Sequence, residues 1–277
     1  MAIVSRSFDR ILLATEGTEF DVDAERVAIE LAAKFGLPLL AVVPVVSNPE
    51  FEIVAPKLAE KAEAQAVMHL DKLRLAAKAR GVELMGSVRS GEAPHQEILA
   101  EARERNVDLI VLRRRGKRGY VANLLIGAMV HTVVGHAPCN VLIVPIAAQM
   151  WKRGILLATD GSAHSDRAVE AAASVAVRCG LPVTVVSVSS PSQEDKARAS
   201  VIVERALKTL QEAGARATGR IASGSPHEAI LALKREVGAD LIVLGRRGVS
   251  GVERLLLGST SERVAGYADC PVLIVQA

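Results

Sequence analysis

The strongest constraint on this chain is an internal repeat that spans most of its length. Three pairs of segments show it, 144, 132 and 131 positions apart: Ile11–Gly17 with Ile155–Gly161, Asp108–Leu112 with Asp240–Leu244, and Val141–Val144 with Val272–Val275. Self-similarity of this kind means that one structural unit occurs twice. The length of 277 residues also favours two domains. We therefore predict one domain over residues 1–148 and a second over residues 149–277.

The spacing of the repeat also predicts how the copies differ. The offset falls by 12 between the second and third predicted strands, so the first copy has about a dozen extra residues around Pro44–Pro56. The copies meet at Ala147–Arg153, a join too short for a flexible linker. We therefore expect the two units to pack together.

Each copy alternates strand-length apolar runs with helix-length amphipathic stretches. In the second copy the predicted strands lie near 154–159, 183–188, 216–222, 240–245 and 272–275, and the predicted helices near 165–179, 193–213, 226–237 and 258–267. This alternation predicts an α/β fold with a doubly wound, five-stranded parallel sheet in each domain. Such sheets bind ligands at the carboxyl ends of their strands, at the switch point. If the strand order is 3-2-1-4-5, Asp160 and Gly245 share that crevice.

The second copy carries a glycine pattern that suits a phosphate. Gly245-Arg-Arg-Gly248 follows the apolar run Leu241–Leu244, and nine residues later comes Gly258-Ser259. Glycines just past a buried strand let the backbone approach a ligand closely. A Gly-Ser step that opens a helix offers free N–H groups to an anion. The pattern therefore favours a nucleotide site in this half.

At these residues the chain resembles the universal stress protein family, in a tandem two-domain form. The closing segment Ala268–Val275 is similar to the family's last strand, and the G-x2-G-x9-G-[ST] motif is specific when a strand and a helix flank it. The resemblance implies a Rossmann-like fold of the adenine nucleotide alpha hydrolase-like type, usually dimeric through the last strands. By the same resemblance the two copies should form an intramolecular pseudo-dimer, with Val141–Val144 alongside Val272–Val275, which would also cover two strand edges. It also implies ATP binding in members that carry the motif and none in members that lack it.

The resemblance assigns a role to each candidate binding residue of the second copy. Asp160 would hold the ribose–adenine side, and Val188 would meet adenine. The remaining residues would surround ribose and the triphosphate, commonly with a divalent cation such as Mg²⁺: Leu244, Gly245, Arg247, Gly248, Gly258, Ser259 and Thr260.

The first copy departs from this pattern. Glu16 replaces the aspartate, Arg113 replaces Gly245, Ala128 replaces Ser259, and one residue is inserted before Gly127. An arginine at the closest backbone approach puts a long side chain where ribose or phosphate would lie. We therefore expect the first site not to bind ATP. Arg113 has an alternative role, in which it fills its own pocket and forms an internal ion pair.

Two of the motif residues have structural alternatives. Ser259–Glu262 reads as a capping box, in which the serine would satisfy backbone donors without any ligand. Asp160-Gly161 reads as a strand-ending turn, since both residue types favour turns. The glycine spacing favours the binding role for both.

Composition and charge narrow the other possibilities. The net charge of +3 is too small to indicate nucleic acid, and the basic run Arg113–Arg118 lacks interleaved aromatic residues, so solvated charge is its default reading. The three cysteines show no CxxC spacing and indicate free thiols in a reducing cytosol. The six histidines show no ligand spacing, and we expect no metal site made by protein ligands alone. We expect a cytoplasmic protein with neither signal peptide nor membrane span.

Together, the glycine motif and the family resemblance predict a non-catalytic, ATP-binding stress-response switch, with the nucleotide in the C-terminal domain. Hydrolysis would need a water activator that the sequence does not identify, and no P-loop, GxSxG, HExxH or kinase motif is present. The alternative is a scaffold or interaction module with both pockets idle. An adenylate-forming enzyme ranks last, because its usual motifs are missing. The protein partners, and any homodimer of the tandem chain, are left open.

Overall fold

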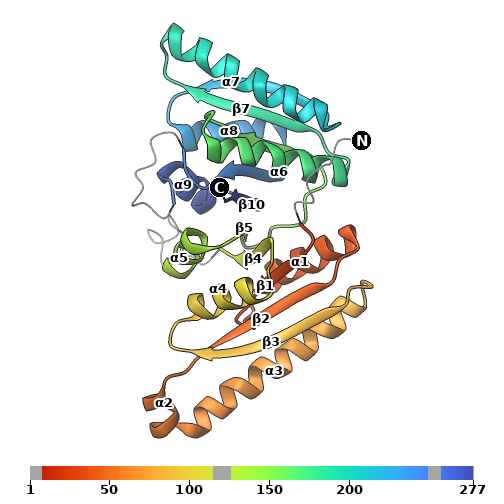
Figure 1. Ribbon diagram of the computed structural model, residues 1–277, viewed down its shortest axis with the longest axis vertical. Helices are drawn as coiled ribbons and strands as arrows, with labels where there is room; N and C mark the ends of the chain where they lie inside the picture. The colour runs from red at the N-terminus through yellow and green to blue at the C-terminus, as the bar shows by residue number, and fades with distance from the viewer. Residues whose placement is uncertain (1–7, 115–125, 249–256, 277) are drawn as a thin grey trace.

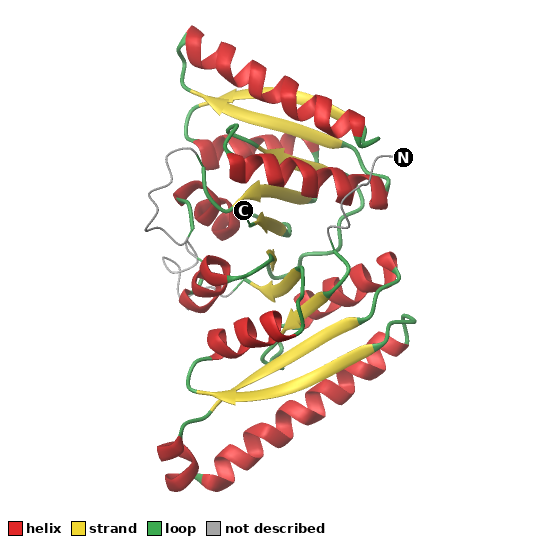
Figure 2. Ribbon diagram, viewed as in Figure 1, coloured by secondary structure: helices red, strands yellow, loops and turns green. Residues whose placement is uncertain are grey.

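The computed structural model describes residues 8–114, 126–248 and 257–276, apart from the side chains of Pro49, Phe51 and Glu52. Within these ranges ten strands form one continuous sheet in the order β3-β2-β1-β4-β5-β10-β9-β6-β7-β8 (Figures 1 and 2). The strands are β1 Ile11–Ala14, β2 Leu39–Val46, β3 Leu84–Gly91, β4 Leu109–Arg113, β5 Asn140–Val144, β6 Ile155–Ala158, β7 Val183–Ser189, β8 Ala217–Ser223, β9 Leu241–Gly245 and β10 Val272–Val275.

Helices follow the strands along the chain, as the alternating pattern predicts. They are α1 Val22–Phe35, α2 Pro49–Val54, α3 Pro56–Lys78, α4 Pro94–Glu104, α5 Ala128–His136, α6 Ala163–Cys179, α7 Gln193–Glu212, α8 Pro226–Val237 and α9 Ser259–Tyr267. Each domain has a doubly wound parallel sheet, and the assumed strand order 3-2-1-4-5 is confirmed in both. One apolar core lies under α1, α3, α6 and α7, and a second lies under α4, α5, α8 and α9 on the opposite face.

The two sheets join through β5 and β10, whose pairing is antiparallel. Leu273 lies opposite Leu142, and Val272 lies opposite Ile143. The predicted alignment of the two last strands is therefore confirmed. The near-identical apolar segments make this pairing natural, because each presents alternate side chains to the same two cores. The result is a pseudo-dimer within one chain, with the domains stacked along the long axis of Figure 1.

The segment between the domains packs as part of the fold. Trp151 and Met150 are buried in the core beneath α1 and α6. Asp240 accepts hydrogen bonds from the amides of Lys152, Arg153 and Gly154 at 2.8 to 3.1 Å. These contacts fix the entry to β6 and confirm that the short join leaves the domains in contact.

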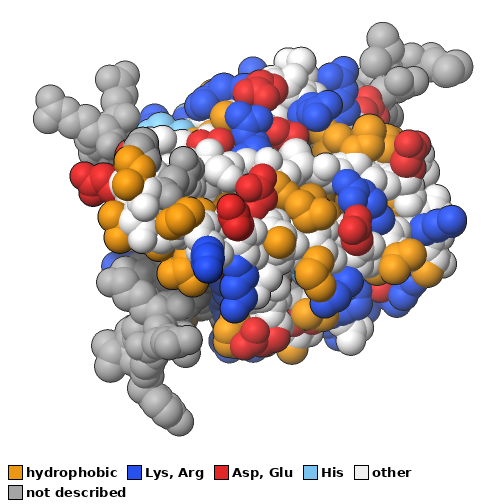
Figure 3. Space-filling model, turned by 90° about the horizontal axis from the view of Figure 1, so that it is seen from below, with side chains coloured by type: hydrophobic (Ala, Val, Ile, Leu, Met, Phe, Trp, Pro, Cys, Tyr) orange, Lys and Arg blue, Asp and Glu red, His pale blue; other side chains and the backbone are white. Residues whose placement is uncertain are grey.

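The extra residues of the first copy form α2 and lengthen the chain before α3. Ile53 and Val54 are 80% and 83% exposed there. Figure 3 views this end of the molecule and shows apolar side chains separated by charged side chains of both signs. Neither the exposure of Ile53 and Val54 nor the surface in Figure 3 indicates that α2 lies near the carboxyl ends of β6 and β9 in the second domain.

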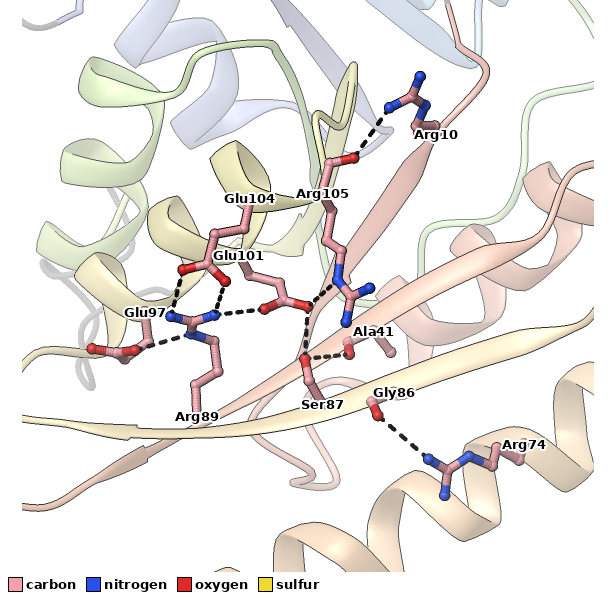
Figure 4. A network of polar contacts seen from close by, with 10 residues as sticks. All are labelled: Arg10, Ala41, Arg74, Gly86, Ser87, Arg89, Glu97, Glu101, Glu104 and Arg105. Atoms are coloured by element: carbon pink, nitrogen blue, oxygen red, sulfur yellow. Dashed lines mark hydrogen bonds and ion pairs between the residues drawn. The ribbon is translucent and has the colours of Figure 1, made fainter.

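A network of ion pairs attaches α4 to the edge strand of the N-terminal domain. The Arg89 guanidinium on β3 lies among three carboxylates of α4, at 3.1 Å from Glu97, 2.8 Å from Glu101 and 2.7 Å from Glu104 (Figure 4). These hydrogen bonds raise the pKa of Arg89. Arg89 pairs with Pro44 of β2 in the first domain. The equivalent pair in the second domain is Ala222 of β8 and Val188 of β7, so alanine stands where the first domain has Arg89. The two domains therefore hold their equivalent helices by different chemistry.

No helix in the described part of the chain is long and apolar enough to cross a membrane.

The cysteines give a test of the core. All three are free, and burial raises the pKa of Cys139 and Cys270 from 9.0 to about 12. At pH 9 about one in a thousand of these thiols is a thiolate, the form that reacts. Burial also raises the pKa of Cys179. We expect a thiol reagent to modify fewer than one cysteine per chain in the native protein and all three in the unfolded protein. Rapid reaction of two native thiols would contradict the buried placement.

Candidate functional site

A cavity of about 410 Å³ opens at the carboxyl ends of the strands in the C-terminal domain. Its walls come from the end of β6, the end of β7, the start of α8, the turn after β9 and the start of α9. It is lined by Ala158, Thr159, Asp160, Ser165, Val186, Val188, Pro226, Ile230, Leu244, Gly245, Arg247, Gly248, Gly258, Ser259, Thr260 and Ser261. All nine residues proposed from the sequence are among them.

The sheet topology explains why distant residues meet here. β6 pairs with β9 in parallel, with Ala158 opposite Leu244, so the turns after both strands leave the sheet side by side. The helices after these two strands cover opposite faces of the sheet. The crevice between the turns is the switch point of a doubly wound sheet.

Packing within the protein itself requires glycine at position 245 and favours it at position 248. A Cβ on Gly245 would lie 2.8 Å from the carbonyl oxygen of His164, at the start of α6. A Cβ on Gly248 would overlap the Asp160 carboxylate. Neither glycine has a left-handed φ, so space and not conformation selects them. The sequence argument had assigned these glycines to close approach of a ligand; the structure adds neighbouring backbone and side chain as a second reason.

The first residues of helix α9 line the same cavity. Its N-cap is Gly258, which offers no capping side chain, so the capping box expected at Ser259 is not formed. The first amides of a helix lack intrahelical acceptors, and here these belong to Ser259, Thr260 and Ser261. The Ser261 hydroxyl donates to the Gly245 carbonyl at 2.8 Å, and the Gly258 amide donates to the Arg246 carbonyl at 3.0 Å. These two bonds fix the helix start against the glycine turn.

Asp160 belongs both to a turn and to the cavity wall. One carboxylate oxygen accepts from the Ser162 amide at 3.1 Å, which shows the turn role. Its other oxygen faces Gly248. The two readings of this residue are therefore compatible.

The charges near the cavity suit an anion. The Arg247 Nε and the His164 Nδ1 are buried and have no hydrogen-bond partner among the described residues. Burial, followed by the charges of Arg246 and Arg247, lowers the pKa of His164, so the ring is neutral at neutral pH. Burial and the Arg247 charge lower the pKa of Arg246 as well. Arg247 lines the cavity and brings a positive charge to its wall, which favours a negatively charged ligand there, whereas the Arg246 side chain is directed to the Gly135 carbonyl of α5.

The equivalent place in the N-terminal domain is closed. The Arg113 guanidinium lies 2.9 Å from Glu16 and 2.7 Å from Asp21, and 5.8 Å above the Phe20 ring. Only about 10 Å³ of space is left among the described side chains there. The alternative in which Arg113 fills its own pocket as an ion pair is therefore the arrangement observed. Residues 115–118 of the basic run lie outside the described residues.

A different hollow of about 640 Å³ opens in the N-terminal domain on the α3 side of the sheet. His69 lies on its wall and contacts Glu25 at 2.8 Å, and the Thr15 hydroxyl donates to the same carboxylate oxygen at 2.6 Å. No helix start and no glycine-rich turn of the described residues lines it. It therefore lacks the anion-binding features of the C-terminal cavity.

Several residues near the cavities were not singled out from the sequence. Pro226 and Ile230 reach the C-terminal cavity from α8, and only the repeat of Pro94-His95 as Pro226-His227 hinted at that helix start. His227 contacts Ser225 at 2.9 Å and stacks on Tyr267, which is a packing role. No group of three or more potential metal ligands occurs among the described residues.

Comparison with known proteins agrees with this architecture. The model of the universal stress protein family matches residues 7–145 and again residues 151–276. The chain belongs to the universal stress protein family. A tandem relative, a universal stress protein of Synechocystis, is 26% identical over 284 residues, covering 95% of this chain and 98% of the relative. A universal stress protein of Thermus aquaticus is 38% identical over 135 residues, covering 44% of this chain and 97% of that protein.

A solved structure shows the same fold over the whole chain. A universal stress protein of Archaeoglobus fulgidus superimposes with a TM-score of 0.79 at 24% identity, covering 96% of each chain. The tandem Rossmann-like arrangement is thus a known form of the universal stress protein fold.

The closed pocket gives a stability prediction. Asp21 is nearly inaccessible, with 3% of its side chain exposed, so removing its cation leaves a buried, uncompensated carboxylate. We expect Arg113→Ala to lower the free energy of unfolding by about 2 to 4 kcal/mol in urea. The matched control is Arg74→Ala, which breaks the exposed pair with Asp71 on α3 and should cost below about 0.5 kcal/mol. Equal losses in the two variants would show that the Arg113 ion pairs add nothing specific.

Proposed function

We propose that this universal stress protein binds ATP, with Mg²⁺, in its C-terminal domain and acts as a non-catalytic, nucleotide-dependent switch in the stress response. The domain boundaries 1–148 and 149–277 are part of this proposal. The observation that supports it best is the open cavity bounded by the glycine turn and the start of α9, beside a closed equivalent in the other domain.

The fit of the nucleotide follows from the lining residues. A volume of about 410 Å³ lies within the range of roughly 300 to 1,000 Å³ for small-molecule pockets. Val188, Pro226 and Ile230 line the cavity with apolar side chains that would suit adenine, and Asp160 would accept hydrogen bonds from ribose. The start of α9, with Gly258, Ser259 and Thr260, would receive the phosphates. Mg²⁺ would share phosphate oxygens and the neighbouring hydroxyl groups.

The arrangement supports binding more than turnover. Arg247 can offset phosphate charge, but among the described lining residues no group stands out as the activator of a water at the terminal phosphate. In the switch we propose, ATP changes the turn that follows Gly245 and thereby a surface that partners read. Ligand can shift that balance only through different affinities for the two states. Residues 249–256 of this segment lie outside the described residues.

The closed first pocket favours a second role for the N-terminal domain, that of a scaffold. Arg113 occupies the place of a ligand there. The scaffold alternative for the whole protein would require the C-terminal cavity to remain idle as well.

Introducing the first domain's arginine into the second domain tests the site directly. We expect Gly245→Arg to abolish ATP–Mg binding, which calorimetry should detect in the wild type at a micromolar-range Kd as a rough expectation. The new side chain would enter the cavity, and its Cβ would press on the His164 carbonyl. Far-UV circular dichroism checks that the variant is folded. Unaltered binding in a folded variant would remove the glycine turn from the site.

A milder pair of serine variants separates a phosphate role from a capping role. Ser259→Ala should weaken ATP binding and leave stability unchanged, because Gly258 is the N-cap of α9. Ser192→Ala is the matched control, since Ser192 caps α7 by accepting from the Asp195 amide at 3.1 Å. It should cost about 1 kcal/mol of stability and leave ATP binding unchanged. A loss of stability without a loss of affinity in Ser259→Ala would assign that serine to capping.

A further inference from the structure

Two equivalent arginines cross the seam between the domains in opposite directions. Arg114 follows β4 and Arg246 follows β9, and their amides donate to Val144 and Val275 at 2.7 and 2.9 Å. The Arg246 side chain reaches the Gly135 carbonyl at the end of α5, at 2.7 Å. The Arg114 side chain reaches the end of α9, so each domain contacts a helix of the other.

Arg114 makes the more extensive contact. Its Nη1 lies 2.8 Å from the Gly266 carbonyl, 2.6 Å from that of Ala268 and 3.4 Å from that of Ala265. Carbonyls at a helix C-terminus have no intrahelical donors, and a cation there interacts favourably with the helix dipole. Arginine does not deprotonate in proteins, so the contact keeps its charge. One guanidinium therefore satisfies the last turn of α9.

The other end of α9 lines the cavity. Helix α9 has nine residues and is therefore about 13 Å long. Because both ends belong to one uninterrupted helix, we expect a displacement of its last turn to shift Gly258, Ser259 and Thr260 as well. Arg246 contacts α5 in the same way, but the start of α5 does not line an open cavity, because the pocket of the first domain is closed.

Arg114 is itself held firmly. Its neighbour Arg113 is fixed by Glu16 and Asp21, and its own amide is bonded to β5. The ion pairs that close the first pocket are therefore adjacent in the chain to the residue that contacts α9.

We propose that Arg114 is a positioning residue through which the N-terminal domain holds α9 and so completes the binding site of the C-terminal domain. The nature of the ligand rests on the proposed function; the hold on α9 does not. The N-terminal domain, whose pocket is closed, then supports the binding site of the C-terminal domain.

Affinity measurements on the full chain test the effect on the site. Arg114→Ala should raise the Kd for ATP–Mg about tenfold and leave the affinity for adenosine unchanged, because the start of α9 faces the phosphates. Arg114→Lys should restore most of the ATP affinity. The matched control is Arg178→Ala, which also removes an interdomain contact, a bond of 3.1 Å to the Phe8 carbonyl and a stacking contact with Phe35. It should leave both affinities unchanged. Equal weakening by Arg178→Ala, or equal loss of adenosine, would overturn the proposal.

Hydrogen exchange without nucleotide tests the hold on α9 separately. Amides 262–268 should exchange faster in Arg114→Ala than in the wild type, and at the wild-type rate in Arg178→Ala. Unchanged exchange in Arg114→Ala would overturn the proposal whatever happens to ATP. If the wild type takes up no ATP in equilibrium dialysis while these amides still exchange faster in Arg114→Ala, the proposed function is wrong and the proposed hold of Arg114 on α9 is retained.

Discussion

The antiparallel pairing of β5 with β10 is the contact on which the rest of the architecture depends. It joins two parallel sheets into one, and it leaves only β3 and β8 as edges among the described strands. It also brings the turns after β4 and β9 near the seam, since each of these strands lies beside a seam strand. Without this pairing, neither Arg114 nor Arg246 could reach the opposite domain.

Within this symmetric frame the two pockets differ most clearly at one pair of equivalent positions, Arg113 and Gly245. Gly245 lies against the His164 backbone and leaves a cavity beside it, whereas Arg113 turns its guanidinium onto Glu16 and Asp21. The surrounding residues differ in the same sense. Arg89 and its three glutamates attach α4 to β3, and the equivalent position of the second domain is occupied by Ala222. The first domain thus has internal ion pairs where the second domain has an open pocket.

The sequence predicted the parts of this structure that depend on local pattern. Repeat offsets and apolar runs located the strands and the helices. The family resemblance, added to the glycine motif, gave the pairing of Val141–Val144 with Val272–Val275 and the nine residues that line one cavity. What failed or was missed depends on tertiary neighbours. The spacing of Ser259 and Glu262 suggested a capping box, but the helix starts on Gly258. Nothing in the chain order shows that His164 abuts Gly245 or that Arg114 meets α9.

The join at Ala147–Arg153 has an evolutionary consequence. In a dimer of separate identical subunits, one gene encodes both halves, so any substitution that closes one pocket closes its mate. Covalent linkage removes that coupling: two dissimilar halves are always assembled in equal number, independent of cellular concentration. One half is then free to specialise as support while the other retains an accessible cavity.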